Sequence, residues 1–251
     1  MRFKDKIAIV TGASSGIGHA VAQALLLCGA SVLGVGSGKS VDSDRDFYGM
    51  ESLSWVDVDV RDPLAPRTIV DAALESFNDR IDILVNAAGI LTLGRCDTTD
   101  MDDWIRTLAV NLDAPFRITK ACIPHLRETK GCVVNVSSIN SNRPFSNTLA
   151  YSVSKAGLDQ LTRVSAVELA EFGVRVNAVN PGVVGTKLHL RAGMTRDAYD
   201  AFVKRGEDTH PLGRIGTAEE VADAVLFLAD APWITGVTLP IDGGRHLTVV
   251  R

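Results

Sequence analysis

The sequence predicts a single-domain α/β fold, a doubly wound parallel sheet of about seven strands with helices on both faces. Short apolar runs rich in β-forming residues alternate with helix-like segments about six times along the chain. These runs are apolar in their middles instead of alternating with polar residues, which is typical of parallel strands buried on both faces. The 251 residues, 46% hydrophobic and 22% charged, suit an ordinary globular protein. Since no linker or internal repeat interrupts the pattern, residues 1–251 are expected to form one domain.

The first strand, 6–11, leads into a glycine-rich turn and a helix that runs to about residue 27. Glycines stand at Gly12, Gly16 and Gly18. Without Cβ atoms, this turn can be tight, its backbone can approach a pyrophosphate, and the helix can pack closely on the strand. The helix N-terminus presents free N–H groups and a partial positive charge to phosphates. The pattern therefore predicts a dinucleotide-binding loop, with a purely structural turn as the alternative.

The second strand, 29–35, should end where the adenosine ribose of a dinucleotide lies. An acid there would bind the 2′-hydroxyl, and a base would accept a 2′-phosphate. The chain has no acid at this point, but Ser37 and Lys39 could receive a phosphate. Lys39 could equally be a solvated loop charge. The polar segment that follows, to residue 51, has no helical pattern, so an abbreviated crossover with a flexible loop is expected.

The remaining elements can be placed in order. A third strand is expected at 52–56, and Asp62 and Pro63 read as the N-cap and first residue of a helix that ends near Phe77. Further on come a strand at 81–85, a long helical region at 102–127 with a break near Pro115, strands at 131–137 and 174–179, a helix to about 172, a capped helix from Thr217 and a last strand at 237–241. The irregular stretch 183–216 is expected to be a substrate loop or lid, with a plain helical hairpin as the alternative.

Polar and small residues follow several strands, where parallel sheets form their ligand crevice. They include Asn86 and Gly89, Ser138, and the pair Pro181–Gly182. Tyr151 and Lys155 stand four positions apart on the helix after Ser138, so both should face the same side. A nearby positive charge lowers the pKa of a phenol from about 10, which favours general acid–base work.

These motifs together resemble the classical short-chain dehydrogenase/reductase family, and the resemblance covers essentially the whole chain. The matching motifs are TGASSGIG (11–18), NAAG (86–89), Asn111, Ser138 thirteen positions before Tyr151, YSVSK (151–155), NPG (180–182) and the ITG…IDGG ending (234–244). The resemblance implies hydride transfer between a nicotinamide and an alcohol or carbonyl carbon. Tyr151 would donate or accept the proton, Lys155 would lower the Tyr151 pKa and hold the nicotinamide ribose, and Ser138 would bind the substrate oxygen. Asn111 would fix a water that connects Lys155 to solvent.

The resemblance also implies the cofactor contacts. Asp59 and Val60 would flank the adenine, Asn86 and the residues after it would line the cofactor cleft, and Pro181, Gly182, Val184 and Thr186 would close over the carboxamide. The full set is Gly12, Ser14, Ser15, Gly16, Ile17, Gly18, Ser37, Lys39, Asp59, Val60, Asn86, Ala87, Gly89, Tyr151, Lys155, Pro181, Gly182, Val184 and Thr186.

The sequence departs from the family pattern at the cofactor site. NAAG replaces the commoner NNAG, and Ser15 stands where many NADP-dependent members have a basic residue. Ser37 is neither the acid of NAD-dependent members nor the Arg of NADP-dependent ones. Lys39 and the missing acid favour NADP(H) over NAD(H) as the NAD(P)(H) cofactor. The family works without metal, and none is expected here.

Composition narrows the function classes. The net charge of −4 and the lack of Lys/Arg runs argue against nucleic-acid or membrane partners. The four widely spaced cysteines suggest buried thiols instead of a metal or disulfide framework. No secretory or membrane-spanning segment is evident, so a cytoplasmic location is expected. The resemblance further suggests a homotetramer built through the helices of Asn111 and Tyr151 and the last strand.

Several functions stay open. Within the family, a ketoacyl or carbonyl reductase competes with an oxidative dehydrogenase of a sugar, hydroxy acid or cyclic diol. A catalytically silent nucleotide-binding sensor or scaffold is an alternative of another class, although it has no chemical need for all four residues of the catalytic set. An epimerase or dehydratase would need a larger carboxyl-terminal domain. His189, Arg191 and His210 could meet an anionic substrate or be ordinary surface residues.

Overall fold

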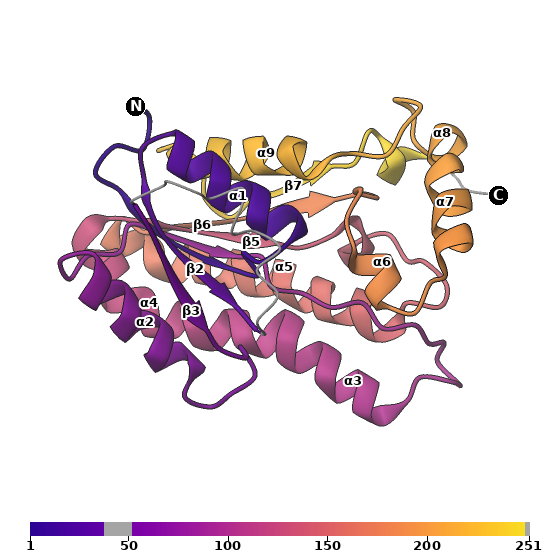
Figure 1. Cartoon of the computed structure of the whole chain (residues 1–251), viewed down its shortest axis with the longest axis horizontal. Coiled ribbons are helices and arrows are strands. Elements are labelled where there is room, and N and C mark those ends of the chain that lie inside the picture. Colours follow the sequence, from indigo (N-terminus) through magenta and orange to yellow (C-terminus); the bar gives the residue numbers. More distant parts are fainter. Residues whose placement is uncertain (38–51, 249–251) are drawn as a thin grey trace.

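The computed structural model describes residues 1–37 and 52–248, and within them the predicted doubly wound sheet is confirmed. Seven parallel strands lie in the order β3-β2-β1-β4-β5-β6-β7 (Figure 1). Their bounds are β1 Ile7–Thr11, β2 Ser31–Gly36, β3 Leu53–Asp57, β4 Ile83–Asn86, β5 Cys132–Val136, β6 Arg175–Pro181 and β7 Thr238–Ile241. Lys39, predicted to contact a phosphate, lies outside the described residues, as does most of the crossover expected between β2 and β3.

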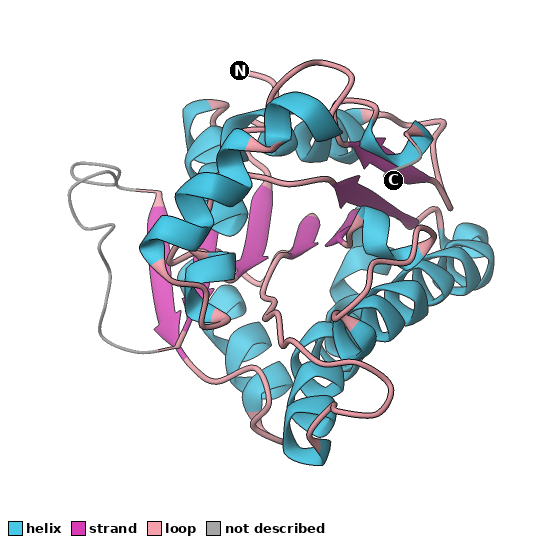
Figure 2. Ribbon diagram, turned by 90° about the vertical axis from the view of Figure 1, so that its right-hand side faces the viewer, coloured by secondary structure: helices cyan, strands magenta, loops and turns pink. Residues whose placement is uncertain are grey.

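Helices cover both faces of the sheet. Figure 1 shows α1 and α9 above it and α2 and α4 below it, and Figure 2 shows the same layers from the right-hand side of that view. The helices are α1 Gly16–Leu27, α2 Ala65–Ser76, α3 Met101–Leu108, α4 Ala114–Thr129, α5 Leu149–Leu169, α6 Leu188–Arg191, α7 Arg196–Lys204, α8 Gly206–Thr209 and α9 Ala218–Asp230. Short 3-10 turns lie at Ile139–Ser141, Ala170–Phe172 and Arg245–Leu247, and a π-helical turn at Ala109–Asp113.

Each face of the sheet carries its own apolar core, which explains the unbroken hydrophobic strands. Along β1, Ala8 and Val10 join the core under α1 and α9, whereas Ile9 joins the core on the side of α2 and α4. Successive side chains of a strand point to opposite faces, so a strand covered by helices on both sides needs apolar residues at every position.

The strand order reverses beside β1. Its backbone pairs with β2 on one side and with β4 on the other, and chain segments leave these two strands in opposite directions across the sheet. In open α/β sheets, ligands bind at such a switch point, outside the carboxyl ends of the strands. The glycine loop follows β1 directly, so the fold places it at this edge.

One expected helix start and one expected loop differ in the structure, and the expected break near Pro115 is confirmed. The helix expected at Pro63 begins at Ala65, because the Asp62 carboxylate accepts the N–H of Leu64 (2.7 Å) and closes a turn before the helix. The long helical region breaks at the π-helical turn Ala109–Asp113, just before Pro115. The stretch 183–216 contains the helices α6, α7 and α8 with irregular segments between them, so it combines features of the expected loop and of the helical alternative. Among the cysteines, Cys122 and Cys132 are buried, but Cys96 is exposed.

A cluster of ion pairs around the buried Asp82 carboxylate holds together the amino-terminal ends of β1 and β4. The Asp82 side chain, 2% exposed, accepts from Lys6 Nζ (2.9 Å), Arg80 Nε (2.7 Å) and the Ile7 N–H (3.0 Å). Burial alone would raise the pKa of Asp82, but the hydrogen bonds from Arg80, Ile7 and Lys6 together hold it below its usual value. The lowered pKa means that this carboxylate stabilises the fold when it is ionised.

Replacing Asp82 with Asn should lower the free energy of unfolding by about 2 kcal/mol at pH 7, less than for a fully buried pair because Lys6 and Arg80 are half-exposed. Since the folded-state pKa is lowered, the contribution is present above the unfolded pKa of about 4 and is lost as the pH falls below it. Urea unfolding between pH 3 and pH 7 measures both effects. Asp230→Asn, which breaks the exposed pair with Arg2, is the control and should cost under about 1 kcal/mol. Equal losses for the two variants would contradict the assignment.

Candidate active site

The glycine loop is packed so tightly that side chains would not fit. A Cβ on Gly12, which has a φ of +70°, would lie 2.8 Å from the backbone N and Cα of Ala88. A Cβ on Gly18 would lie 2.4 Å from the carbonyl oxygen of Gly12. The Thr11 hydroxyl, at the end of β1, accepts the N–H groups of Ala87 (3.0 Å) and Ala88 (3.1 Å). The loops after β1 and β4 are thereby joined into one surface at the switch point.

The N-terminus of α1 is open to an anion. Its N-cap, Ser15, makes no capping hydrogen bond, and the first turn has no acidic residue. A Cβ on Gly16, which has a φ of +57°, would lie 3.2 Å from Thr186 Cγ2, so the segment after β6 covers the loop. Arg191 of α6 donates from its guanidinium to the Ser15 hydroxyl (3.0 Å). Free N–H groups, the helix dipole and a guanidinium therefore converge where a phosphate would bind.

Tyr151 and Lys155 lie on the same side of α5, as their spacing predicts. The Lys155 ammonium is 5.8 Å from the centroid of the Tyr151 ring. Lys155 is 4% exposed, and its Nζ donates to the carbonyl of Val136 at the end of β5 (2.8 Å). Burial lowers the pKa of Lys155 to about 8, against the opposing charge of Asp159. The helix thus delivers an ammonium to the carboxyl edge of the sheet.

The pKa of Tyr151 differs from the sequence-based expectation. Burial raises it, and a hydrogen bond with Ser138 only partly opposes that rise. Lys155 was expected to lower this pKa, but its ammonium is directed to a main-chain carbonyl instead. The protein without a bound ligand therefore holds Tyr151 as a neutral phenol, which is ready to donate a proton.

Ser138 is held by a residue that sequence reasoning missed. The Ser138 hydroxyl accepts the Asn140 N–H (3.2 Å) and lies 3.3 Å from Asn140 Oδ1. The Asn140 amide also donates to Thr148 Oγ1 (3.2 Å) and Ser152 Oγ (3.3 Å), at the start of α5. Asn140 therefore links the serine loop to the helix of Tyr151. Its position two residues after Ser138 was the available signal, but a polar residue in a loop is too common to single out.

Asn111 owes its place in a helix to the π-helical turn. Its side chain is fully buried: Oδ1 accepts the Ile90 N–H (2.9 Å), and Nδ2 donates to the Ile90 carbonyl (2.9 Å) and Ser154 Oγ (3.1 Å). A Cβ on Gly89 would lie 3.5 Å from Asn111 Oδ1 and 3.6 Å from Lys155 Nζ. Asn111, Gly89 and Lys155 are therefore neighbours, although the Asn111 amide is already hydrogen-bonded to Ile90 and Ser154.

The side chains of Asn86 and Asp59, which were predicted to contact the cofactor, form hydrogen bonds and an ion pair within the protein. The Asn86 side chain, 2% exposed, donates to Asn135 Oδ1 (2.9 Å) and Thr119 Oγ1 (3.2 Å), between the sheet and α4. It points into the protein because β4 continues through Asn86, so only its main chain is available at the crevice. The Asp59 carboxylate pairs with Arg61 (2.5 Å), whose hydrogen bond is the main reason for its lowered pKa.

The other predicted residues divide by burial. Ser37 is exposed at the end of β2, and Ser14 lies beside it, since a Cβ on Gly36 would be 3.3 Å from Ser14 Cβ. Val60, Pro181 and Val184 are buried, whereas Ile17, Ala87, Gly182 and Thr186 are partly exposed. The structure thus brings the glycine loop, Ser138, Tyr151, Lys155 and Thr186 to one edge of the sheet.

Comparison with known proteins decides the family. The family model described as enoyl-(acyl carrier protein) reductase matches residues 12–246. The chain belongs to the short-chain dehydrogenase/reductase family. Members of this family are oxidoreductases that use NAD(P)(H) and act on CH–OH or C=O groups, and the tight glycine cradle and open α1 N-terminus of this short-chain dehydrogenase/reductase fit such a dinucleotide.

Relatives of this short-chain dehydrogenase/reductase have different substrates. It is 35% identical to trans-4-hydroxycyclohexanecarboxylate dehydrogenase of Sinomonas cyclohexanicum, covering 97% of this chain and 94% of that one. It is 38% identical to a putative ketoacyl reductase of granaticin polyketide synthesis from Streptomyces violaceoruber, covering 96% of each. A short-chain dehydrogenase/reductase of unknown function from Caenorhabditis elegans, solved with cofactor, superimposes with a TM-score of 0.93 at 34% identity, covering 99% and 98% of the two chains.

Residues 1–37 and 52–248 contain neither a metal-binding cluster nor a helix that could span a membrane. These residues contain no cluster of three or more His, Cys, Asp or Glu side chains that could hold a metal ion. In the same ranges, no helix has the length and apolar character needed to cross a membrane. The cytoplasmic location expected from the sequence stays a prediction.

Proposed function

We propose that the protein transfers a hydride between NADP(H) and a small alcohol or ketone, with Tyr151 as the general acid and base. The observation that carries this proposal is the juxtaposition of Tyr151, Lys155 and Ser138 at the carboxyl ends of β5 and its neighbours, beside a loop that only glycine can form. A bound nicotinamide would supply or accept the hydride. The chain's own residues would place the substrate oxygen and move the proton.

In the reductive direction, the Tyr151 phenol would donate its proton to the carbonyl oxygen of the substrate as negative charge develops there. The Ser138 hydroxyl would donate a second hydrogen bond to the same oxygen and stabilise that charge. Asn140, which holds the Ser138 hydroxyl, would fix its direction. In the oxidative direction, Tyr151 would take the proton from the alcohol, and the Lys155 charge would offset the burial that raises the Tyr151 pKa. Asn111 and Lys155 both neighbour Gly89. Asn111 would support Lys155 through a water that we expect to connect Lys155 to solvent.

The experiment that tests cofactor use is a parallel fluorescence titration with NADPH and NADH. Tighter NADPH binding would support the NADP(H) assignment, and tighter NADH binding would reverse it. Binding of neither would overturn the proposed function. The sequence has no acid at residues 36–39, where NAD-dependent members of the family have one, and this favours a cofactor with a 2′-phosphate. The guanidinium of Arg191 at Ser15 would bind a phosphate of the cofactor.

Arg191→Gln should weaken NADPH binding about tenfold, because a charge-assisted bond to phosphate is lost. The guanidinium reaches the glycine loop from α6, at the position where Ser15 replaces a basic residue. An equal loss for NADPH and NADH would assign Arg191 to the pyrophosphate, and a loss for NADPH alone would assign it to the 2′-phosphate. The matched control is Arg196→Gln, which removes an exposed Arg of the adjacent helix α7. If Arg191→Gln bound both cofactors like the wild type, Arg191 would have no role in binding.

The named relatives suggest which of the family's substrates this protein uses. The hydroxycyclohexanecarboxylate dehydrogenase and a 34%-identical meso-2,3-butanediol dehydrogenase of Serratia marcescens support an oxidative enzyme of hydroxy acids or diols. The ketoacyl reductase relative supports the reductive alternative. Steady-state rates with a cyclic hydroxy acid, a vicinal diol and a β-ketoacyl thioester would separate these substrates.

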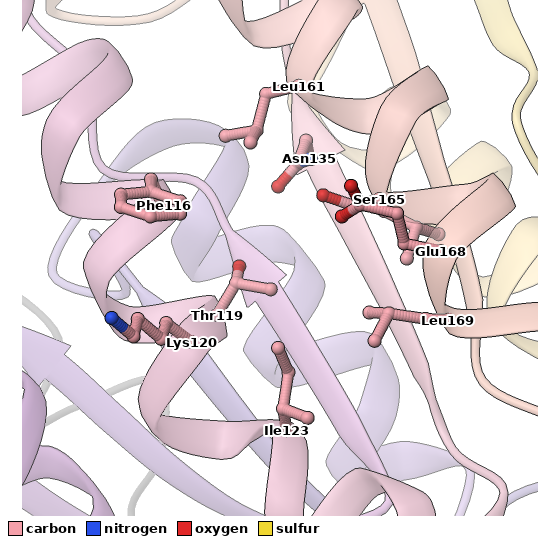
Figure 3. Close-up of a pocket in the computed structure, with 10 residues that line it drawn as sticks. Phe116, Thr119, Lys120, Ile123, Asn135, Leu161, Ser165, Glu168 and Leu169 are labelled. Atoms are coloured by element: carbon pink, nitrogen blue, oxygen red, sulfur yellow. The ribbon is translucent and has the colours of Figure 1, made fainter. Parts of the chain in front are cut away.

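The groove between α4 and α5 supports a homo-oligomer, which the family resemblance suggests to be a tetramer. Figure 3 shows Phe116, Lys120 and Ile123 of α4 facing Leu161 and Leu169 of α5 across it. The groove begins ten residues after Tyr151, about 15 Å along the helix, so it is separate from the catalytic residues. Phe116 is exposed, and further large apolar side chains are exposed on α3 and α5: Met101, Ile105, Val153, Val164 and Val167. Such a face fits a second copy of the chain, and light scattering after size-exclusion chromatography measures the assembly.

A further inference from the structure

Three buried nitrogens lack a hydrogen-bond partner near the carboxyl edge of β6 and β7. They are His189 Nδ1 of α6, His210 Nε2 directly after α8, and Arg245 Nε after β7, and none has a partner among the described residues. His210 is 3% exposed, whereas His189 and Arg245 are partly exposed. Buried polar groups are nearly always hydrogen-bonded, because an unmet one costs about 1–3 kcal/mol. A cluster of three such groups therefore points to a missing ligand.

The charges of this cluster identify the ligand as an anion. Arg245 follows Gly243, where a Cβ would lie 3.6 Å from His210 Cβ, and the positive charge of Arg245 adds to burial in lowering the pKa of both His189 and His210. The nearby Arg143 lowers the pKa of Arg245 in turn, after burial. The negative charge of Asp242 opposes these shifts at His210 and Arg245 but acts more weakly than burial.

Asp242, the acid nearest to Arg245 in sequence, already has hydrogen-bond partners for both of its carboxylate oxygens. Asp242 Oδ1 accepts the Gly244 N–H (3.1 Å), and Oδ2 accepts the His246 N–H (2.6 Å) and faces His246 Nδ1 (2.9 Å). No ion pair joins Asp242 to Arg245 within residues 1–37 and 52–248. The acids beside His210 on α8, Glu207 and Asp208, are exposed. The cluster therefore has room for one more negative group.

The cluster lies on the substrate side of the catalytic residues. β5, β6 and β7 are adjacent, about 4.8 Å apart, and their ends deliver Ser138, Gly182 and Asp242. A Cβ on Gly182 would lie 2.8 Å from Asp242 Cβ, so these ends touch. Arg143, five positions after Ser138, donates to the Arg245 carbonyl. The guanidinium carbons of Arg143 and Arg245 lie 5.3 Å and 5.1 Å from the centroid of the Phe145 ring. The loop after Ser138 thus connects the catalytic serine to the cluster.

We propose that Arg245, His189 and His210 form a subsite that binds a carboxylate of the substrate, which makes the substrate a hydroxy or keto acid. The proposal rests on the proposed function for the reacting end of the substrate, and the carboxylate subsite is new. Arg245 supplies a charge-assisted hydrogen bond, and each imidazole supplies an N–H.

His210 gives the subsite a protonation signature. Its Nδ1 lies 3.0 Å from the Gly206 carbonyl, which only accepts, so Nδ1 carries a hydrogen and neutral Nε2 carries a lone pair. Nε2 can donate to a carboxylate only after His210 gains a proton. Carboxylate binding therefore takes up a proton near neutral pH, where burial and Arg245 keep the free ring neutral, and affinity falls as the pH rises.

The test is isothermal titration of the protein, with and without NADPH, using cyclohexanecarboxylate and cyclohexanecarboxamide as unreactive probes. The wild type should prefer the carboxylate about 10- to 100-fold, the range expected for hydrogen bonds to charged groups. Repeating the titration in two buffers of different ionisation enthalpy should reveal proton uptake. Arg245→Met should abolish the preference while leaving carboxamide binding unchanged.

Conservative variants keep the proposal testable if Arg245→Met does not fold. His189→Phe retains a ring that can pack against Phe202 (4.8 Å between centroids in the wild type) but removes the nitrogens. His210→Asn retains a donor for the Gly206 carbonyl and should abolish proton uptake. Each should weaken carboxylate binding, whereas the control Arg196→Gln should not.

Wild-type carboxylate affinity in Arg245→Met, or in both histidine variants, would overturn the subsite. A wild type without carboxylate preference would do the same. Because the probes are not turned over, these results are independent of Tyr151 chemistry. Failure to bind NADPH or NADH would instead overturn the proposed function. The carboxylate titration of the protein without cofactor could still be interpreted.

Discussion

Tyr151→Phe should lower kcat by about 10²- to 10⁴-fold, the range that general acid–base catalysis supplies. The change removes only the hydroxyl that would exchange a proton with the substrate oxygen. The phenyl ring keeps its place near the Lys155 ammonium, 5.8 Å from the ring centroid, so NADPH and NADH binding should stay within about twofold. Steady-state kinetics and fluorescence titration measure the two quantities.

Tyr199→Phe is the matched control, because it removes the phenol of the described tyrosine on α7 and should leave kcat unchanged. A Tyr151→Phe variant with wild-type kcat would refute the mechanism. If wild type and variant both bound cofactor and neither turned over any alcohol or ketone, the sensor or scaffold alternative would gain support.

Lys155→Met should lower kcat as strongly and also weaken cofactor binding by about tenfold, unlike Tyr151→Phe. The buried ammonium donates to the Val136 carbonyl, and a methionine keeps the stem but loses both the charge and this bond. Because burial lowers the Lys155 pKa to about 8, wild-type cofactor affinity should decline as the pH rises above 8. In Lys155→Met, this decline should disappear.

Lys204→Met, an exposed lysine at the end of α7, controls for the loss of one positive charge. Thermal unfolding of Lys155→Met separates a binding defect from misfolding. Unchanged cofactor affinity in a folded Lys155→Met would show that Lys155 does not hold the cofactor.

The sequence by itself determined the order of strands and helices along the chain and the glycine loop, and it predicted the catalytic set, which stays a prediction. These features depend on local rules. Apolar runs without alternation mark buried parallel strands, as in Ile7–Thr11, and Gly12 and Gly18 stand where the backbone leaves no room for a Cβ. The i/i+4 spacing of Tyr151 and Lys155 fixes their common side once the helix forms. Helix boundaries were less well predicted, since Asp62 closes a turn instead of capping a helix at Pro63.

Only the tertiary structure decided which side chains face the crevice and what surrounds them. Asn86 turns away because β4 extends through it, and the Tyr151 pKa rises because burial acts more strongly than the hydrogen bond with Ser138. Arg191 meets Ser15 across 176 positions of sequence, and the proposed carboxylate subsite would join α6 to the segment after β7. Such contacts and desolvation depend on how distant segments pack. That packing leaves no periodic or local signal in the sequence.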